Sequence, residues 1–142
     1  MNSQAQTAIP HDRPDQLQQV QSGLLQGETL YCVYDDKGIG TGYVALTDLR
    51  VIFQNKSLLP EFPAHHNKTA IISVPYSQIA SVSILFDKSW LGNWFSSSVL
   101  HINTTGGRNY VCQLRATDRT RHLHDTILWK ITPHSTGNQE RA

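Results

Sequence analysis

The chain has 142 residues, 39% of them hydrophobic, which suits one domain with a single core. Twelve Lys and Arg residues nearly balance eleven Asp and Glu residues, so the formal net charge is only +1. A general nucleic-acid binder is usually much more basic, and we therefore expect no nucleic-acid partner. No apolar run in the sequence approaches the ~20 residues that cross a bilayer.

The N-terminal residues 1–12 are polar and show no periodicity, which predicts a flexible segment. They have neither the basic nor the apolar region of a secretory signal. The two cysteines, Cys32 and Cys112, lie within strand-like runs and lack the spacing of a metal site. We therefore expect a cytoplasmic protein with two buried, reduced thiols, no metal and no cofactor.

The first regular element is expected between Pro14 and Gln26, where apolar residues recur at helical spacing. Asp12 is a candidate N-cap for this helix, and Gly27 is a candidate stop signal. The pattern predicts a short amphipathic helix that docks on the main body or on a neighbouring subunit.

Seven strand-like runs follow, each rich in β-branched and aromatic residues. Their expected ranges are 28–34, 42–46, 50–54, 69–74, 79–86, 97–104 and 109–114. A polar turn at Thr47–Leu49 joins the second and third runs into an antiparallel hairpin. In the third run, Val51 and Phe53 alternate with Ile52, which is therefore expected on the opposite face of the sheet.

The last element is expected at 117–131, where the hydrophobic period changes from two to about 3.6 residues. Leu123 and Ile127 lie on its apolar face, together with Ile131. Thr117 or Asp118 is the expected N-cap. We predict that this helix packs against the preceding sheet.

Seven strands followed by one helix indicate an α+β fold that is mainly β. The helix is expected to cover an open end of a curled sheet, which would otherwise expose its interior. We place the domain at 13–132, between the flexible segment 1–12 and a C-terminal tail at 133–142.

Several short motifs along the domain belong together. They are Gly27-Glu28, Gly42-Tyr43, Leu46-Thr47-Asp48 with Arg50 and Phe53, and Val74-Pro75-Tyr76 with Ile79 and Val82. With them the chain resembles the pleckstrin-homology-like superfold, specifically the GRAM and bacterial pleckstrin-homology-like families, over about 24–131. The resemblance implies a seven-stranded, partly open antiparallel barrel, capped by the C-terminal helix and without catalytic residues. It also implies a binding platform for lipid headgroups, for proteins or for copies of itself.

The first hairpin turn departs from the pattern of the family members that bind phosphoinositides. Those members place several Lys and Arg residues there, whereas this chain reads Asp35-Asp36-Lys37-Gly38-Ile39-Gly40. Phosphate recognition needs concentrated cationic donors. Two carboxylates against one amine therefore argue against high-affinity phosphoinositide binding at this turn.

The strongest candidate site is an apolar patch. The segment after residue 86 carries four large side chains and a proline-containing loop adds three more: Trp90, Leu91, Trp94, Phe95, Leu58, Leu59 and Phe62. The four in the tight segment do not all fit one core, so they either partly cover the barrel mouth or form a contact patch. Lys88 is the nearest cation and Asp87 offsets it, which favours a protein over an anionic membrane.

Other motifs favour structural roles. Gly38-x-Gly40-x-Gly42 precedes a strand, so no helix N-terminus is available to hold a phosphate. His122 and His124 lie two apart on a helix and face different directions. Folding is able to bring Glu28 and Asp48 together, although their spacing alone does not indicate it.

A basic bias near the C-terminus favours a solvated helix face over an anion-binding patch. Its members are Arg108, Arg115, Arg119, Arg121 and Lys130.

We therefore expect a non-enzymatic module that contacts a protein, either another protein or a second copy of itself. The first alternative is a peripheral membrane domain that seats the same aromatic residues at the headgroup boundary. The second alternative is a small-ligand carrier or an enzyme that uses the barrel interior.

If the aromatic segment mediates contact, Trp94→Ala is expected to weaken association and leave the fold largely intact. Each large side chain contributes about 1.5–3 kcal/mol when it is fully removed from water. Sedimentation of the two proteins measures the effect, and a wild type that stays monomeric at high concentration rules out self-association. Flotation with neutral and anionic liposomes tests the membrane alternative separately.

Overall fold

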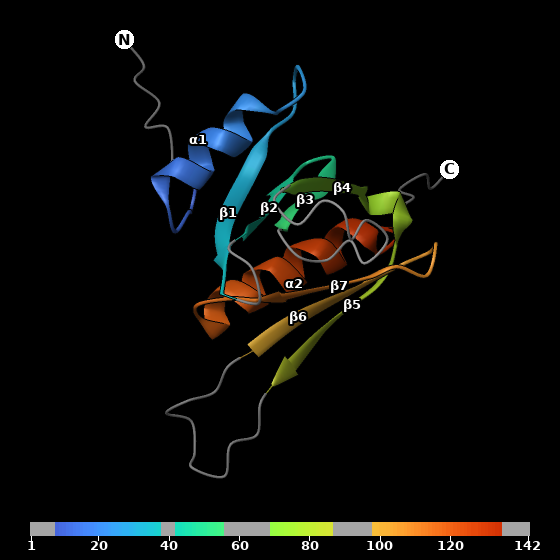
Figure 1. Cartoon of the computed structure of the whole chain (residues 1–142). Helices are drawn as coiled ribbons and strands as arrows, with labels where there is room; N and C mark the ends of the chain where they lie inside the picture. Colours follow the sequence, from blue (N-terminus) through green and yellow to red (C-terminus); the bar gives the residue numbers. More distant parts are fainter. Residues whose placement is uncertain (1–7, 38–41, 56–68, 87–97, 135–142) are drawn as a thin grey trace, which may run out of the picture.

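The computed structural model describes residues 8–37, 42–55, 69–86 and 98–134 and shows two sheets and two α-helices in this part of the chain (Figure 1). In chain order the elements are α1 (Pro14–Ser22), β1 (Leu30–Asp36), β2 (Gly42–Thr47), β3 (Arg50–Asn55), β4 (Ala70–Pro75), η2 (Tyr76–Gln78), β5 (Ile79–Phe86), β6 (Ser98–Thr104), β7 (Asn109–Gln113) and α2 (Thr117–Ile131). Strands β1–β4 form sheet A and β5–β7 form sheet B, with antiparallel pairing throughout. The predicted α+β, mainly β architecture is confirmed.

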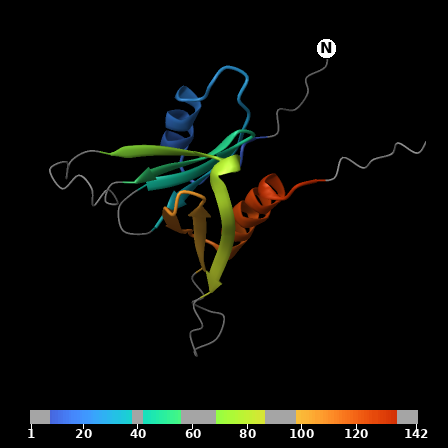
Figure 2. The ribbon, with the colours of Figure 1, turned by 90° about the vertical axis from the view of Figure 1, so that its right-hand side faces the viewer.

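The two sheets together form a partly open barrel and are connected to each other on two opposite sides of it. On one side the chain passes from β4 through η2 directly into β5, which turns it from sheet A into sheet B (Figure 2). On the other side Asp36 at the end of β1 forms an isolated bridge with Leu114 after β7. The Asp36 carboxylate also accepts the Gln113 N–H (3.0 Å), and the Gln113 carbonyl accepts the Lys37 N–H (2.7 Å).

The main core lies between the two sheets and α2. It takes alternate residues from the strands, including Val51 and Phe53 from β3, and the apolar face of α2. Leu123 and Ile127 are fully buried and Ile131 packs at the margin, as the helical period predicted. The helix therefore covers the open end of the curled sheet.

A second, smaller core occupies the other face of sheet A. Helix α1 and Ile9 pack there against β1, β2 and β3, and Ile52 is buried on this face, opposite to Val51 and Phe53. The segment before α1 is held to β1 by hydrogen bonds between Pro10 or Asp12 and Val33 (3.0 and 3.2 Å). Every residue of β2 is consequently buried, because both faces of the strand are covered.

The predicted ends of α1 are wrong in two respects. The helix stops at Ser22, four residues before Gln26, because Gly23 takes the C-cap position and bonds back to the last turn. Gly27 instead adopts φ 82° in the connection to β1, a conformation that suits glycine. The N-cap residue is Arg13, so Asp12 does not cap the helix.

The predicted N-cap of α2 is also wrong, since Ala116 occupies that position and Thr117 is the first residue of the helix. Its bounds nevertheless agree with the predicted 117–131. Neither helix of the described chain is long and apolar enough to cross a membrane.

Both cysteines are buried and unpaired, as expected. Burial raises the pKa of Cys32 to about 12 and also raises the pKa of Cys112. Both thiols are therefore protonated at neutral pH and act as small apolar side chains.

The role of α2 as the cap predicts a contrast between two leucines on the same helix. Leu123→Ala should lower the free energy of unfolding by about 2–5 kcal/mol, because it leaves a cavity in the main core. Leu128→Ala, at a position 44% exposed, should change it by less than about 0.5 kcal/mol. Urea denaturation of the three proteins measures both values, and equal losses would contradict the assignment of the buried face.

Candidate functional site

The residues of the predicted apolar patch lie outside the described part of the chain. Trp90, Leu91, Trp94 and Phe95 belong to 87–97, and Leu58, Leu59 and Phe62 belong to 56–68. Their arrangement therefore stays a prediction. The structure does place the two residues that flank 87–97, Phe86 at the end of β5 and Ser98 at the start of β6. It also shows the surfaces of these two strands.

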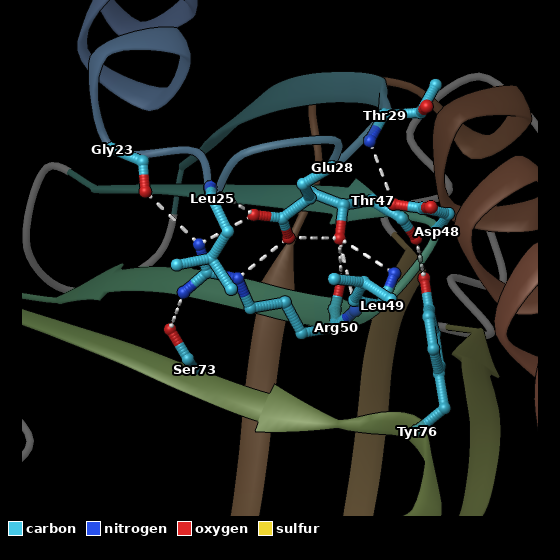
Figure 3. A network of polar contacts seen from close by, with 10 residues as sticks. All are labelled: Gly23, Leu25, Glu28, Thr29, Thr47, Asp48, Leu49, Arg50, Ser73 and Tyr76. Carbon is cyan, nitrogen blue, oxygen red and sulfur yellow. Dashed lines mark hydrogen bonds and ion pairs between the residues drawn. The ribbon is translucent and has the colours of Figure 1, made fainter.

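The most extensive polar network of the described residues surrounds the buried carboxylate of Glu28 (Figure 3). Arg50 binds both carboxylate oxygens through Nε (2.8 Å) and Nη2 (2.9 Å), a bidentate ion pair. The remaining guanidinium donors reach the Gly23 carbonyl (3.2 Å) and the Ser73 hydroxyl (2.7 Å). The Leu25 N–H also donates to Glu28 (2.9 Å).

The same network fixes the turn between β2 and β3. The Thr47 hydroxyl donates to Glu28 (2.6 Å) and accepts the backbone N–H groups of Leu49 (3.0 Å) and Arg50 (3.1 Å). The Asp48 carboxylate accepts the Thr29 N–H (2.8 Å). The turn is thereby tied to the α1–β1 connection by side chains that satisfy backbone groups.

Two further contacts connect this turn to η2 and α2, one made by a tyrosine hydroxyl and one by a lysine amine. The Tyr76 hydroxyl in η2 donates to the Thr47 carbonyl (2.6 Å). Lys130 of α2 donates to the Asp48 carbonyl (3.4 Å), and its Nζ lies 5.2 Å from the Tyr31 ring centroid. The Leu-Thr-Asp-x-Arg motif therefore connects four regions at one end of the barrel: the α1–β1 connection, β4, η2 and α2.

The electrostatics of this network suit a fixed ion pair and do not suit acid–base chemistry. The hydrogen bonds from Arg50 lower the pKa of Glu28 to about 2, aided by those from Thr47 and Leu25 and opposed by burial. A general base needs a pKa near the working pH. Folding does bring Glu28 and Asp48 into one network, but internal donors engage both carboxylates.

A second polar cluster lies where β1 ends and α2 begins. Asp35 accepts from Gln16 (2.8 Å) and, through one oxygen, from two nitrogens of Arg115 (2.9 and 2.6 Å). Asp12 accepts the Asp35 N–H (2.9 Å) and pairs with Arg119 Nε (2.6 Å). The carboxylate of Asp12 therefore fastens the segment before α1 to the barrel and to α2.

This second cluster engages two members of the basic bias near the C-terminus. Arg115 and Arg119 both face carboxylates, and the guanidinium of Arg119 also lies 5.6 Å from the Tyr34 ring centroid. The Tyr34 hydroxyl is hydrogen-bonded to His122 Nδ1 (2.8 Å). The two arginines thus form ion pairs within the fold, which the expected solvated helix face did not include.

The surface with the clearest potential for a partner is the outer face of sheet B. The side chains that point away from the main core occupy alternate positions on the three strands: Ser81, Ser83, Leu85, Val99, His101, Asn103, Asn109, Val111 and Gln113. None of these nine is Asp, Glu, Lys or Arg. Two are large apolar side chains with high exposure, Leu85 at 55% and Val111 at 49%.

The outer face of sheet B differs from the equivalent face of sheet A. Helix α1 covers the outer side of β1, β2 and β3 in sheet A, and α2 packs against the inner side of β5 and β6 (Figures 1 and 2). Within the described residues, no helix or strand lies over the outer side of sheet B. Phe86, the last residue of β5, is also half exposed, but by the alternation of the strand it lies on the side of Val82 and Ile84 and not on this face.

Sequence reasoning did not identify this face, although part of its signal is visible in the sequence. Ser81, Ser83 and Leu85 alternate with core residues along β5, which shows that β5 has an uncharged outer side. The pairing of β5 with β6 and of β6 with β7 decides which outer residues become neighbours. That register follows from the folded sheet and not from any single strand.

Comparisons with known proteins bear on the fold. No protein-family model matches the sequence, and no curated protein matches it. Among solved structures, the chain is similar to the pleckstrin homology domain from Shewanella amazonensis SB2B, with a TM-score of 0.59 and 19% identity over 84% of this chain and 98% of the other.

A second similar structure is a DUF1696 family protein with a pleckstrin-homology domain from Shewanella loihica PV-4. The TM-score is 0.53 and the identity 18%, over 85% of this chain and 95% of the other. At such low identity these similarities speak to the fold alone. Together with the two sheets and the capping helix, they show that the chain has a pleckstrin-homology-like fold.

The buried ion pair predicts a specific dependence of stability on pH. The pKa of Glu28 is about 2 in the folded protein against an ordinary value of 4.5, so its contribution is full above pH 4.5 and is lost as the pH falls toward 2. Glu28→Gln should cost about 3–5 kcal/mol at neutral pH, because it leaves Arg50 without its partner. The variant should also lose less stability than the wild type between pH 4.5 and 2.

The exposed ion pair between Arg13 and Asp15 (2.8 Å) provides the control. Asp15→Asn should leave the free energy of unfolding nearly unchanged, because solvent screens this pair. Chemical denaturation across the pH range gives both comparisons. Parallel stability curves for the wild type and Glu28→Gln below pH 5 would contradict the assigned role of Glu28.

Proposed function

We propose that this chain is a non-enzymatic binding module of the pleckstrin-homology-like type that contacts a protein partner through the outer face of sheet B. The observation that carries the proposal is the uncharged outer face, on which Leu85 and Val111 are exposed and which no described element covers. Surfaces that become interface cores are depleted in charged residues.

A protein partner fits this face better than an anionic membrane does. Peripheral membrane binding relies on Lys and Arg residues that meet acidic headgroups around an apolar anchor. The nine residues of the outer face of sheet B include no Lys and no Arg. The acidic residues of the first hairpin, Asp35 and Asp36, accept internal hydrogen bonds. The face therefore offers apolar and hydrogen-bonding groups, and none of its nine residues is cationic like Lys or Arg.

The internal polar networks support a binding role over catalysis. The two clusters of ionisable groups described above are centred on Glu28 with Arg50 and on Asp35 with Asp12. Each carboxylate in them is engaged by donors of the fold itself. The resemblance to the GRAM and bacterial pleckstrin-homology-like families supports the same reading, because those families act as binding platforms.

Site-specific photo-cross-linking in cells tests the proposal directly. A photoreactive amino acid at Val111 should give adducts of protein mass, since this side chain lies on the proposed contact face. The same amino acid at Asp125, an exposed position on α2, is the matched control and should give few adducts. Equal yields at both positions, or none at Val111, would argue against a contact on this face.

A further inference from the structure

The two edges of sheet A differ in how their backbone groups are satisfied. Along the edge of β1, residues 10–12 lie as a short parallel strand. The Val33 N–H donates to the Pro10 carbonyl (3.0 Å), and the Val33 carbonyl accepts the Asp12 N–H (3.2 Å). The opposite edge belongs to β4, which pairs with β3 alone among the described strands. Within the described residues, the chain therefore covers one edge of this sheet with its own backbone and leaves the other open.

The contacts of Arg50 establish which residues of β4 bond to β3. The Arg50 N–H donates to Thr47 Oγ1 (3.1 Å), and the same oxygen lies 3.3 Å from the Arg50 carbonyl, so the backbone of Arg50 faces β2 and not β4. The partner of Arg50 on β4 is Pro75, which has no N–H to donate. Both observations make this pair one without hydrogen bonds between β3 and β4.

The alternation along the strand then assigns the other backbone groups of β4. Hydrogen-bonded and non-hydrogen-bonded pairs alternate in an antiparallel ladder. The pairs of Val74 and Ile72 are therefore the bonded ones, and their backbone groups face β3. The N–H and C=O groups of Ser73 and Ile71 consequently point to the open edge. Their side chains lie on the outer side of the sheet, where Ile71 is 58% exposed.

The edge of β4 lacks the features that commonly protect such an edge. Natural sheets protect an open edge with charged side chains, with proline or with a β-bulge. Residues 69–86 contain no Asp, Glu, Lys or Arg, and Pro75 stands only at the last position of β4. The six pairs of β3 with β4 keep one register, whereas the register of β5 shifts between Ile79 and Ser81. β4 is therefore an uncharged edge with an unbroken register.

The edge of β4 is also not paired with the neighbouring sheet. Figure 2 shows that β4 and β5 leave η2 in different directions, and no ladder joins them in the described chain. Ile72 on the inner side of β4 is only partly buried at the margin of the main core. A strand added at this edge would therefore have an apolar neighbour on each side of the sheet, Ile71 on the outer side and Ile72 on the inner side.

We propose that the open edge of β4 binds an extended peptide segment of a partner protein, which adds to sheet A as a further strand. The backbone groups of Ile71 and Ser73 select this occupant, because a row of donors and acceptors at strand spacing is matched by the backbone of another strand. The segment carries apolar residues beside Ile71 and Ile72 and a small or polar residue beside Ser73. This site is separate from the outer face of sheet B and does not depend on the proposed function of that face.

Amide hydrogen exchange tests the state of the edge in the free protein. In dilute solution, the amides of Ile71 and Ser73 should exchange at least about tenfold faster than the amide of Ile72, which bonds to β3. Slow exchange of the two edge amides at every protein concentration would show that the chain covers this edge itself. Slow exchange that appears only as the concentration rises would assign the edge to a second copy. Either result overturns the proposal.

A synthetic strand tests the binding itself. The probe is acetyl-Lys-Thr-Val-Val-Thr-Lys-amide, whose palindromic sequence suits both strand directions. It should slow the exchange of the Ile71 and Ser73 amides and leave the Ile72 amide unchanged. The control is the same peptide N-methylated at both valines and both threonines, which lacks the donors and should bind at least about tenfold more weakly. Equal binding of the two peptides, or no effect of the probe at ~5 mM, overturns the proposal.

Two substitutions at one position separate the backbone from the side chain. Ile71→Pro removes an N–H that faces the edge and should weaken binding of the probe at least about fivefold, without loss of a bond to β3. Ile71→Val keeps this N–H and should bind within about threefold of the wild type. Thermal melting shows whether both variants fold, and the N-methylated peptide tests the same bonds on the unaltered protein. A folded Ile71→Pro variant that binds like the wild type contradicts the proposal.

The cross-linking position on sheet B keeps the two sites distinguishable. Adducts at Val111 should be the same in the wild type and in Ile71→Pro, because the substitution lies on the other sheet. Loss of the probe with adducts retained at Val111 assigns the strand site to β4. Loss of both together shows that the effect of Ile71→Pro is not confined to its edge and overturns the assignment.

Discussion

The buried ion pair between Glu28 and Arg50 holds together one end of the barrel. A carboxylate in this position is tolerated only because the hydrogen-bonding groups around it are matched. Its donors come from the α1–β1 connection and from β3, while the Thr47 hydroxyl adds a third from the end of β2. The β2–β3 turn and the ion pair therefore depend on each other. Without the turn, the Glu28 carboxylate loses the Thr47 donor, and without Glu28 the Thr47 hydroxyl loses this acceptor.

The positions of the two cores determine which faces of each sheet stay exposed. In sheet A, strands β1, β2 and β3 are covered on both faces, by the main core and by α1, whereas the outer side of β4 is exposed, with Ile71 at 58%. Sheet B buries only its inner face, and α2 packs there. The free sheet surface of the described chain therefore lies on β4 and on the outer side of β5, β6 and β7, where none of the outward residues is Asp, Glu, Lys or Arg.

Local sequence patterns were sufficient for the elements but not for the contacts between them. The ranges of β5 and α2 agree with their predicted bounds, because a change of hydrophobic period is a local property. The predicted stop of α1 at Gly27 is wrong, because Gly23 already ends the helix and bonds back to its last turn. The pairs Asp12–Arg119 and Asp35–Arg115 join residues far apart in the chain, and no spacing rule indicates them.

The candidate site shows the same limit. The Leu-Thr-Asp-x-Arg motif was visible in the sequence, yet the role of Glu28 as the partner of Arg50 required the fold. The aromatic residues near Trp94 were conspicuous by their type, whereas the outer face of sheet B is built from ordinary residues such as Ser83 and Asn103. Such a face acquires its character only when the strand register makes its members neighbours.

The placement of α1 implies a hierarchy of local opening. No residue of α1 belongs to the main core, and the helix is held by a few apolar contacts and by polar anchors such as Gln16, whose amide oxygen has no partner within the described chain. Detachment of α1 together with residues 9–12 would expose the second core and leave the barrel and α2 packed. Such sub-global opening costs less than complete unfolding. The amino-terminal part of the domain is therefore an energetically separate layer over a barrel that keeps its own core.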